Sequence, residues 1–260
     1  MRQLSLEEIK QLEIDILAYV VEICDRNSIA YFLSYGTLLG AVRHHGFIPW
    51  DDDVDLVMFR KDYNRFLKIV EADPHPRYRV LTPNDKGYFY TFAKVVDRKT
   101  IVVEEEVEQM PDNGVWVDIF PLDAVKSISS IHTKTCYLLN KCRAASIYKK
   151  YPKEKGISYL SWKICKLIGP RVFLALFEAI CQKNNNEQAQ YISVISNPYR
   201  NMFDRSIYEE ALLLDFEGKQ YKCPKEYDKL LTILYGNYML PPKKEDQIPH
   251  QMNAYILYEN

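Results

Sequence analysis

The residues of this chain best suited to chemistry are carboxylates, because Asp51, Asp52, Asp53 and Asp55 fill four of five consecutive positions. Carboxylates this dense raise one another's pKa unless a positive charge neutralises them. A divalent cation is the natural counterion, since Mg²⁺ prefers oxygen ligands and leaves coordination sites for waters and substrate phosphates. The cluster therefore indicates a metal site.

The spacing of these acids predicts which of them share a ligand. Residues 53–58 alternate acid and apolar side chains and then become wholly apolar, which predicts a strand. Because side chains alternate across a strand, Asp51, Asp53 and Asp55 should share one face and could share one metal ion. Asp52 should point to the opposite side, so it is the weakest ligand candidate of the four.

A further acid, Asp118, lies within the apolar run Val-Trp-Val-Asp-Ile-Phe. Bare carboxylates are rarely buried, so Asp118 either caps a turn or faces a cation. For Asp118 considered alone, the turn cap and the cation contact are equally well supported. Beside a strand that carries Asp53 and Asp55, the cation interpretation is the better one. We expect Asp118 to bind the metal, and it could also accept a proton from an attacking hydroxyl.

Small and basic residues near the acids are suited to binding phosphate. Gly36 and Thr37 open a short helical pattern whose N-terminal amides could hold a phosphate group, and Thr37 adds a hydroxyl. Arg43, His44 and Lys94 are the nearby cations that could neutralise phosphate oxygens. We expect these five residues to bind the substrate.

Other functions compete for the acid cluster. A calcium loop is disfavoured, because the cluster lacks the glycine and the distal glutamate of an EF-hand. A nucleotide-sugar glycosyltransferase is the more serious competitor, since Asp51-Asp52-Asp53 or Asp53-Val54-Asp55 could be its DxD motif. A non-catalytic scaffold that binds ligand through a basic helical region is the alternative from a different class.

The elements around these residues predict an α+β fold. Amphipathic helices are expected at 5–26, where Ser5 and Glu8 form a capping box, and at 60–73. A helix is also expected at 224–235. Strands are expected where β-branched and aromatic residues cluster, at 29–34, 53–58, 78–81, 88–96, 100–103 and 114–120, the last stopped by Pro121, with a hairpin at 216–223.

The sequence pattern of residues 126–200 is typical of helices. Segment 126–155 holds eight basic residues against one acid, and segment 160–183 is apolar-rich and broken at Gly169-Pro170. A helical subdomain with a solvated basic face is favoured, because charge runs are usually solvated. The more specific alternative is a basic patch that binds phosphate-rich or lipid-linked substrate at a membrane surface. We expect one compact unit with a catalytic core at 1–125, a helical region at 126–200 and a C-terminal segment at 201–260 that packs back on the core.

Composition limits the partners and the location. The net charge of -1 gives no overall basic field to recruit nucleic acid. The six cysteines form no CxxC pair, which disfavours a zinc knuckle. Free thiols without an export signal predict a cytoplasmic protein, and the membrane-patch alternative would place it at the inner face of the membrane. No apolar run is long enough to predict a spanning helix.

Three motifs together resemble the LicD-type phosphotransferases, which include bacterial phosphorylcholine transferases and the fukutin-related proteins. SYGTLLGAVRHHGFIPWDDDVDL resembles the family signature, VWVDIFPLD its second motif, and FEGKQYKCPKEYDKLLTILYGNYMLPP its C-terminal motif. The motifs occur in order and cover residues 28–123 and 202–245, whereas 126–200 lies outside them.

The resemblance implies a nucleotidyltransferase-like fold, in which helices flank a small mixed sheet with acids on adjacent strands. The step Gly36-Thr37 lies farther from Asp53 than in polymerase-β-type transferases. By resemblance, Asp53, Asp55 and Asp118 carry Mg²⁺, with Mn²⁺ as an alternative, and Asp51 supports them.

The resemblance also implies the reaction. The donor would be a CDP-linked alcohol such as CDP-choline, and the acceptor a cell-envelope glycan such as teichoic acid or lipopolysaccharide, including lipid-linked forms. The enzyme would form a phosphodiester on a sugar hydroxyl and release CMP. Tyr88-Phe89-Tyr90 could form an aromatic cage for a quaternary ammonium, but ordinary strand packing explains these residues better.

Overall fold

The core of the molecule is a mixed β-sheet with the strand order β2-β3-β7-β5-β4, which β8 and β9 extend beyond the end of β7. A computed structural model describes residues 1–150, 156–198, 201–247 and 252–257. β3 and β7 are parallel, and the other neighbours in this sheet are antiparallel. The predicted α+β class is confirmed. The strands of the sheet are β2 (Phe32–Leu33), β3 (Asp55–Phe59), β4 (Tyr78–Leu81), β5 (Ala93–Asp97), β7 (Trp116–Val125), β8 (Tyr191–Ser193) and β9 (Met202–Asp204).

Two amphipathic helices pack on this sheet. α1 (Leu6–Arg26) packs against β5 and β7, and α3 (Arg60–Ala72) packs against β3, β4 and β7. The capping box of Ser5 and Glu8 is confirmed at the start of α1. A stripe of residues three or four apart is buried along α1, and one of them is a glutamate: Ile9, Glu13, Ile16, Leu17, Val20 and Cys24.

Alternation along β7 separates the two faces of the sheet. Val117 and Ile119 are fully buried in the same core cluster as the apolar stripe of α1. Trp116 and Phe120 point to the other face and are only partly buried, and Asp118 shares their side because it lies between them at a spacing of two. The face opposite α1 is therefore where a ligand could reach the sheet.

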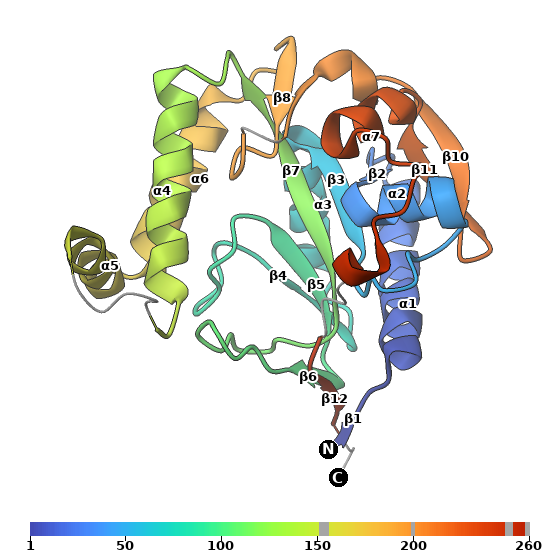
Figure 1. Cartoon of the computed structure of the whole chain (residues 1–260), viewed down its shortest axis with the longest axis horizontal. Coiled ribbons are helices and arrows are strands. Elements are labelled where there is room, and N and C mark those ends of the chain that lie inside the picture. Colours follow the sequence, from blue (N-terminus) through green and yellow to red (C-terminus); the bar gives the residue numbers. More distant parts are fainter. Residues whose placement is uncertain (151–155, 199–200, 248–251, 258–260) are drawn as a thin grey trace.

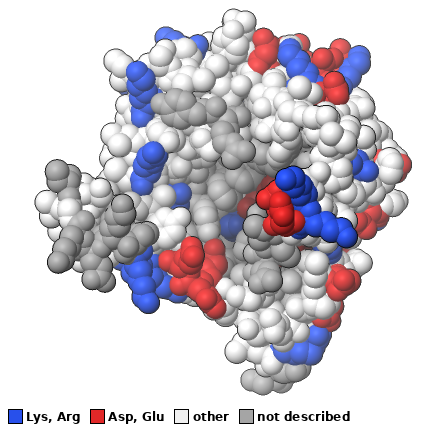
Figure 2. Space-filling view, viewed as in Figure 1, with Lys and Arg blue, Asp and Glu red and all other residues white. Residues whose placement is uncertain are grey.

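Two groups of elements flank this face. α2 (Tyr35–His44), α7 (Tyr227–Tyr235) and the hairpin of β10 (Ala211–Phe216) and β11 (Lys219–Pro224) lie to the right of β7 in Figure 1. α4 (Ile131–Ile147), α5 (Ile157–Ile168) and α6 (Pro170–Asn184) lie to its left. Figure 2 shows a hollow between the two groups. In the described ranges, no helix has the length and hydropathy to cross a membrane.

The two ends of the chain meet in a separate small sheet. β12 (Ala254–Ile256) lies between β1 (Arg2–Gln3) and β6 (Thr100–Val102), and all its pairings are antiparallel. The prediction that 100–103 continues the main sheet was therefore wrong. Short 3₁₀ helices, Arg205–Tyr208 and Lys244–Asp246, complete the described elements.

Several strand boundaries differ from the prediction. β3 begins at Asp55 rather than at residue 53, and β5 begins at Ala93 rather than at 88. β7 continues through Pro121 to Val125. Pro121 is tolerated because β5 pairs only as far as Ile119 and β8 only from Asp123, so no antiparallel partner requires an N–H from the proline.

Helices dominate residues 126–200 as expected, and the chain breaks at Gly169, where φ is 80° and Pro170 begins α6. The same segment also contains β8, which pairs with β7 of the main sheet. The division of the chain into three segments stays a prediction.

Candidate active site

Adjacent strands bring the central residues of the site to one register. Asp55, the first residue of β3, pairs with Asp118 of β7, and Lys94 of β5 lies opposite Asp118 from the other side. Neighbouring strands are about 4.8 Å apart, and residues at one register share a face. Asp118 therefore lies between a carboxylate and an ammonium group on the open face of the sheet.

Lys94 is held by Asp118 and by aromatic rings. Its Nζ donates to Asp118 Oδ1 at 2.8 Å and lies 3.7 Å from the centre of the Trp116 ring. Both charged side chains are almost completely removed from solvent. Lys94 thus neutralises Asp118, a predicted metal ligand, in this structure. Contact between Lys94 and donor phosphates stays a prediction.

Asp51 and Asp53 face the start of α2. They lie before β3 in an irregular segment, so strand alternation does not account for their common orientation. A β-carbon on Gly36 would overlap with Asp51 Oδ2 and would lie 3.9 Å from Asp53 Oδ1. Thr37 is buried, and its Oγ1 accepts a hydrogen bond of 2.8 Å from the backbone N–H of Asp55. The first turn of α2 is therefore docked onto the acids.

Asp52 points away from this group, as expected. It is buried, and its Oδ2 accepts a hydrogen bond of 2.8 Å from the backbone N–H of Met252 in the C-terminal segment. Asp52 therefore anchors the segment that carries Asp51 and Asp53.

Arg43 and His44 lie at the opposite end of α2 from Gly36, roughly 10 Å along the helix axis at 1.5 Å per residue. Arg43 Nη1 donates to the carbonyl oxygen of Tyr238 at 2.7 Å. Burial lowers the pKa of both side chains. The structure therefore groups Gly36, Thr37 and Lys94 with the acids and separates Arg43 and His44 from them.

The electrostatics of the site reflect an excess of carboxylates. Burial raises the pKa of Asp55 well above its ordinary value, and the charges of Asp53 and Asp118 raise it further. Burial also raises the pKa of Asp118 to about 6, although Lys94 opposes this shift. One lysine does not offset the acids, so a divalent cation would be stabilised here.

The donor atoms of the site suit magnesium, although they are not already arranged around a metal. Carboxylate oxygens are the ligands that Mg²⁺ prefers. Across the part of the chain that the structure describes, no three His, Cys, Asp or Glu side chains form a group that could hold a metal as they stand. The metal roles of Asp51, Asp53, Asp55 and Asp118 stay predictions.

Glu13 of α1 lies near the acids of the site but was not among the residues predicted from the sequence. Its side chain is fully buried, and neither carboxyl oxygen has a hydrogen-bond partner among the described residues. Burial raises its pKa well above the ordinary value, and the charges of Asp53 and Asp52 add to this effect. The signal in the sequence was a glutamate in the apolar stripe of α1, four residues from both Ile9 and Leu17.

Aromatic side chains continue the open face beside the acids. Phe120 lies with its ring centre 4.3 Å from that of Phe92 and 5.5 Å from that of Tyr35. All three side chains are partly exposed. Tyr88 and Phe89 are buried in a separate apolar cluster, so ordinary packing explains them. The apolar wall of the site therefore comes from Tyr35, Phe92 and Phe120.

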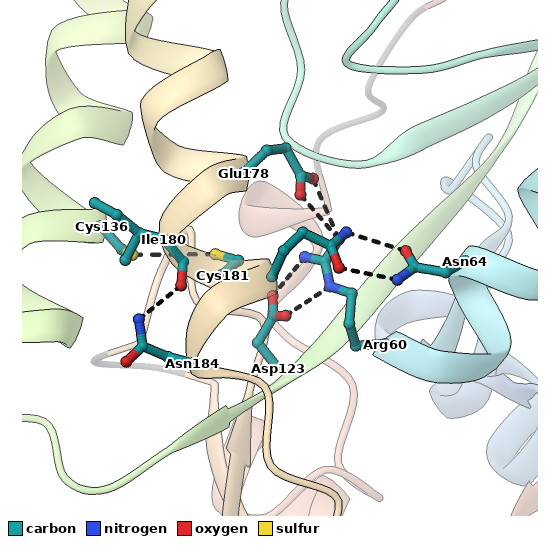
Figure 3. A network of polar contacts seen from close by, with 9 residues as sticks. Arg60, Asn64, Asp123, Cys136, Glu178, Ile180, Cys181 and Asn184 are labelled. Atoms are coloured by element: carbon teal, nitrogen blue, oxygen red, sulfur yellow. Dashed lines mark hydrogen bonds and ion pairs between the residues drawn. The ribbon is translucent and has the colours of Figure 1, made fainter.

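An ion network centred on a buried arginine joins β7 to two helices, as Figure 3 shows. Arg60 of α3 donates to both carboxylate oxygens of Asp123 at 2.6 and 2.7 Å, and its Nη1 contacts Glu178 of α6 at 3.1 and 3.2 Å. Arg60 is 1% exposed. The network joins α3, β7 and α6 five residues along the strand from Asp118.

Comparison of the sequence with known proteins identifies its family. Residues 28–155 match the family described as LicD/FKTN/FKRP, nucleotidyltransferase domain. Over 99% of its length, the chain is 32% identical to the whole of the lipopolysaccharide cholinephosphotransferase LicD of Haemophilus influenzae. The chain belongs to the LicD family. The resemblance of its three motifs is confirmed, and the chain is an enzyme of this transferase family.

Other relatives match a smaller part of this LicD-family chain. The ribitol 5-phosphate transferases FKRP of Mus musculus and Homo sapiens are each 48% identical over 110 residues, which are 40% of this chain and 19% of theirs.

Proposed function

We propose that the chain transfers a phospho-alcohol group, phosphocholine or a related one, from a CDP-linked donor to a sugar hydroxyl of a cell-envelope glycan, with release of CMP. The observation that carries this proposal is the pair Asp55 and Asp118, side by side on parallel strands of a LicD-family enzyme. The activities for which its relatives are named, cholinephosphate transfer and ribitol 5-phosphate transfer, support the kind of group moved.

Mg²⁺, with Mn²⁺ as an alternative, would be held by Asp53, Asp55 and Asp118, and Asp51 would support them. The fit rests on the excess of buried carboxylates over cations at this place. When bound, the ion would neutralise the donor diphosphate and the charge that develops on the leaving CMP.

Asp118 would take the proton of the attacking sugar hydroxyl. In this step the hydroxyl oxygen bonds to the phosphorus of the phospho-alcohol group, and the bond from that phosphorus to CMP breaks. A carboxylate held beside the metal can act as a general base toward a hydroxyl positioned within hydrogen-bond reach. Lys94, bonded to Asp118 Oδ1, would keep the carboxylate oriented.

Donor phosphates would lie beside Gly36 and Thr37, where the positive end of α2 meets the acids. Lys94 would face the same phosphates. Arg43 and His44 would serve a more distant part of the donor, because they lie at the other end of α2.

The alcohol would contact the wall of Tyr35, Phe92 and Phe120. Aromatic faces attract a quaternary ammonium group, which favours choline over a neutral polyol. The acceptor would be an envelope glycan, lipid-linked forms included, and the reaction would take place on the cytoplasmic side of the membrane. Nucleic acid has no role in this proposal, in line with the net charge.

A donor screen tests the reaction. The chain is incubated with Mg²⁺ and CDP-choline, CDP-ribitol or CDP-glycerol, and CMP is measured. We expect CMP release with one donor and a loss of at least about 100-fold in Asp118→Asn. Asp53→Asn should lose CMP release as well, whereas Asp73→Asn, an exposed aspartate after α3, should keep full activity.

Two outcomes would replace the proposal with its competitors. Release of UDP from a UDP-sugar without any CMP would show a nucleotide-sugar glycosyltransferase. Full biological function in both Asp53→Asn and Asp118→Asn, combined with loss of function after charge reversal of Lys149 and Lys150, would show a scaffold that works through its basic helices.

A further inference from the structure

α5 carries an apolar stripe that the chain itself leaves uncovered. Leu160, Ile164 and Leu167 follow one another at helical spacing and are 59%, 51% and 89% exposed. Among the described side chains of α5, none is buried. Single exposed apolar residues are normal on a protein surface, but a continuous stripe marks an interaction site.

α6 carries further exposed apolar side chains. Ile168 ends α5, and Val172 and Leu176 lie four residues apart on α6, after the turn at Gly169. All three side chains are between 44% and 50% exposed. α5 and α6 contact each other, and Figure 1 places α5 at the outer left edge of the molecule. We call this surface the α5–α6 face; it consists of Leu160, Ile164, Leu167, Ile168, Val172 and Leu176.

The surroundings of the α5–α6 face are basic, although the whole chain has a net charge of -1. The described residues of 126–198 include ten Lys and Arg and two acids. Both acids are paired with cations of α3, Glu178 with Arg60 and Glu187 with Lys61. Figure 2 shows Lys and Arg along this side of the molecule, with one patch of Asp and Glu beside them. The exposed basic residues are Lys126, Lys134, Lys141, Lys149, Lys150, Lys163, Arg171 and Lys183.

The loop that packs against the end of α4 carries four glutamates, Glu104, Glu105, Glu106 and Glu108, which offset part of this charge. Glu108 pairs with Lys166 at 2.6 Å. Lys163 and Arg171 lie within the α5–α6 segment itself, and both are exposed. An apolar stripe flanked by such cations matches a bilayer with anionic headgroups, where apolar side chains enter the interface and cations contact the phosphates.

We infer that the α5–α6 face docks the enzyme on the surface of an anionic membrane. A second copy of the chain fits this face less well, because a two-fold contact would bring the same basic residues against one another. The inference goes beyond the proposed reaction, since it concerns a surface outside the strands that carry the acids.

Vesicle sedimentation with the full chain tests the inference. We expect binding to vesicles of phosphatidylglycerol and phosphatidylethanolamine, and much weaker binding to pure phosphatidylcholine. The double variant Ile164→Glu/Leu167→Glu should lose at least tenfold in affinity, and Lys163→Glu/Arg171→Glu should lose a similar factor that shrinks at high salt. Leu213→Glu and Lys219→Glu, exposed positions on the β10–β11 hairpin, are the matched controls and should bind as the parent does.

The substituted side chains are exposed, so all variants should fold, which circular dichroism checks. CMP release from a soluble donor should be unchanged in Ile164→Glu/Leu167→Glu, which separates docking from the proposed reaction. Equal binding to anionic and neutral vesicles, or no binding by the parent chain, would overturn the inference. A parent dimer that Ile164→Glu/Leu167→Glu converts to a monomer would assign the face to a second copy instead.

Discussion

At Gly36 the site leaves no space for a β-carbon, because one would overlap with the Asp51 carboxylate. Asp51 Oδ2 is the end of a side chain, so it can move away at little cost in stability. We therefore predict that Gly36→Ala changes the free energy of unfolding by less than about 1 kcal/mol but weakens Mn²⁺ binding and CMP release at least tenfold. Urea unfolding and titration calorimetry measure the two effects.

Gly40, one turn further along α2, is the matched control. A β-carbon there would overlap with the backbone carbonyl oxygen of Gly46, which cannot move without the loop. Gly40→Ala should therefore destabilise the fold by about 1–3 kcal/mol. If Gly36→Ala destabilised the fold as much as Gly40→Ala, Gly36 would be a packing residue and not part of the site.

Glu13 leads to a prediction about pH. Its carboxyl has a raised pKa in the folded state, so the folded state holds this proton more tightly than the unfolded chain, whose carboxyl titrates near 4.5. The stability that protonation supplies is complete below pH 4.5 and is lost as the pH rises towards the folded pKa. Without divalent metal, Glu13→Gln should therefore gain stability over the parent chain at pH 8 but not at pH 4.

Urea unfolding in EDTA at the two pH values measures this difference. Glu7→Gln, an exposed glutamate of the same helix, should show no such dependence on pH. A loss of stability in Glu13→Gln at pH 8 would mean that Glu13 is ionised and paired in the folded protein.

Part of the site follows from residue types and spacing alone. Asp53, Asp55 and Asp118 stand out because acids inside apolar runs require a physical explanation. Strand alternation was the wrong reason for separating Asp52 from its neighbours, since residues 51–54 lie before β3. The partner of Lys94 could not be predicted, since it depends on the register between β5 and β7. Glu13 was missed because one glutamate in an amphipathic helix does not reveal which residues surround it.

At the scale of the elements, Arg60 connects two helices to the strand that carries Asp118. Removing it would leave Asp123, which is buried, and Glu178, which is partly buried, without their cation. Arg60→Met should therefore cost about 3–5 kcal/mol in the free energy of unfolding. Urea unfolding measures this loss.

Arg65→Met, on an exposed part of the same helix, is the control and should cost less than about 1 kcal/mol. Replacing Arg60, Asp123 and Glu178 together by apolar residues should recover most of the stability that Arg60→Met loses, because no unpaired charge remains buried. A similar cost for Arg65→Met and Arg60→Met would show that the network contributes little.

Element types were easier to predict than their boundaries and partners. Amphipathic spacing located α1 and α3, and glycine and proline located the break between α5 and α6. Pro121 misled the prediction of β7, because only the pairing of its neighbours shows that no N–H is needed there. The apolar pattern of α5 predicted a helix correctly, but it could not show that this stripe would remain exposed.

At the scale of the whole molecule, the C-terminal segment joins the start of the chain to the site. β12 lies between β1 and β6, and the backbone N–H of Met252 binds the buried carboxylate of Asp52, whose neighbours are Asp51 and Asp53. Deleting residues 252–260 should therefore lower the free energy of unfolding by at least about 2 kcal/mol, since Asp52 would lose a buried partner and β1 and β6 would lose the strand between them. Urea unfolding measures this change.

The same deletion should weaken Mn²⁺ binding, because the segment 51–53 would no longer be anchored. Asp52→Ala should reproduce the loss of metal affinity with a smaller loss of stability, as it keeps β12 in place. Deleting only residues 258–260 is the control, since β12 ends at Ile256. If the long deletion bound Mn²⁺ as tightly as this control, the acids would be positioned by α2 and β3 alone, through Gly36 and Thr37.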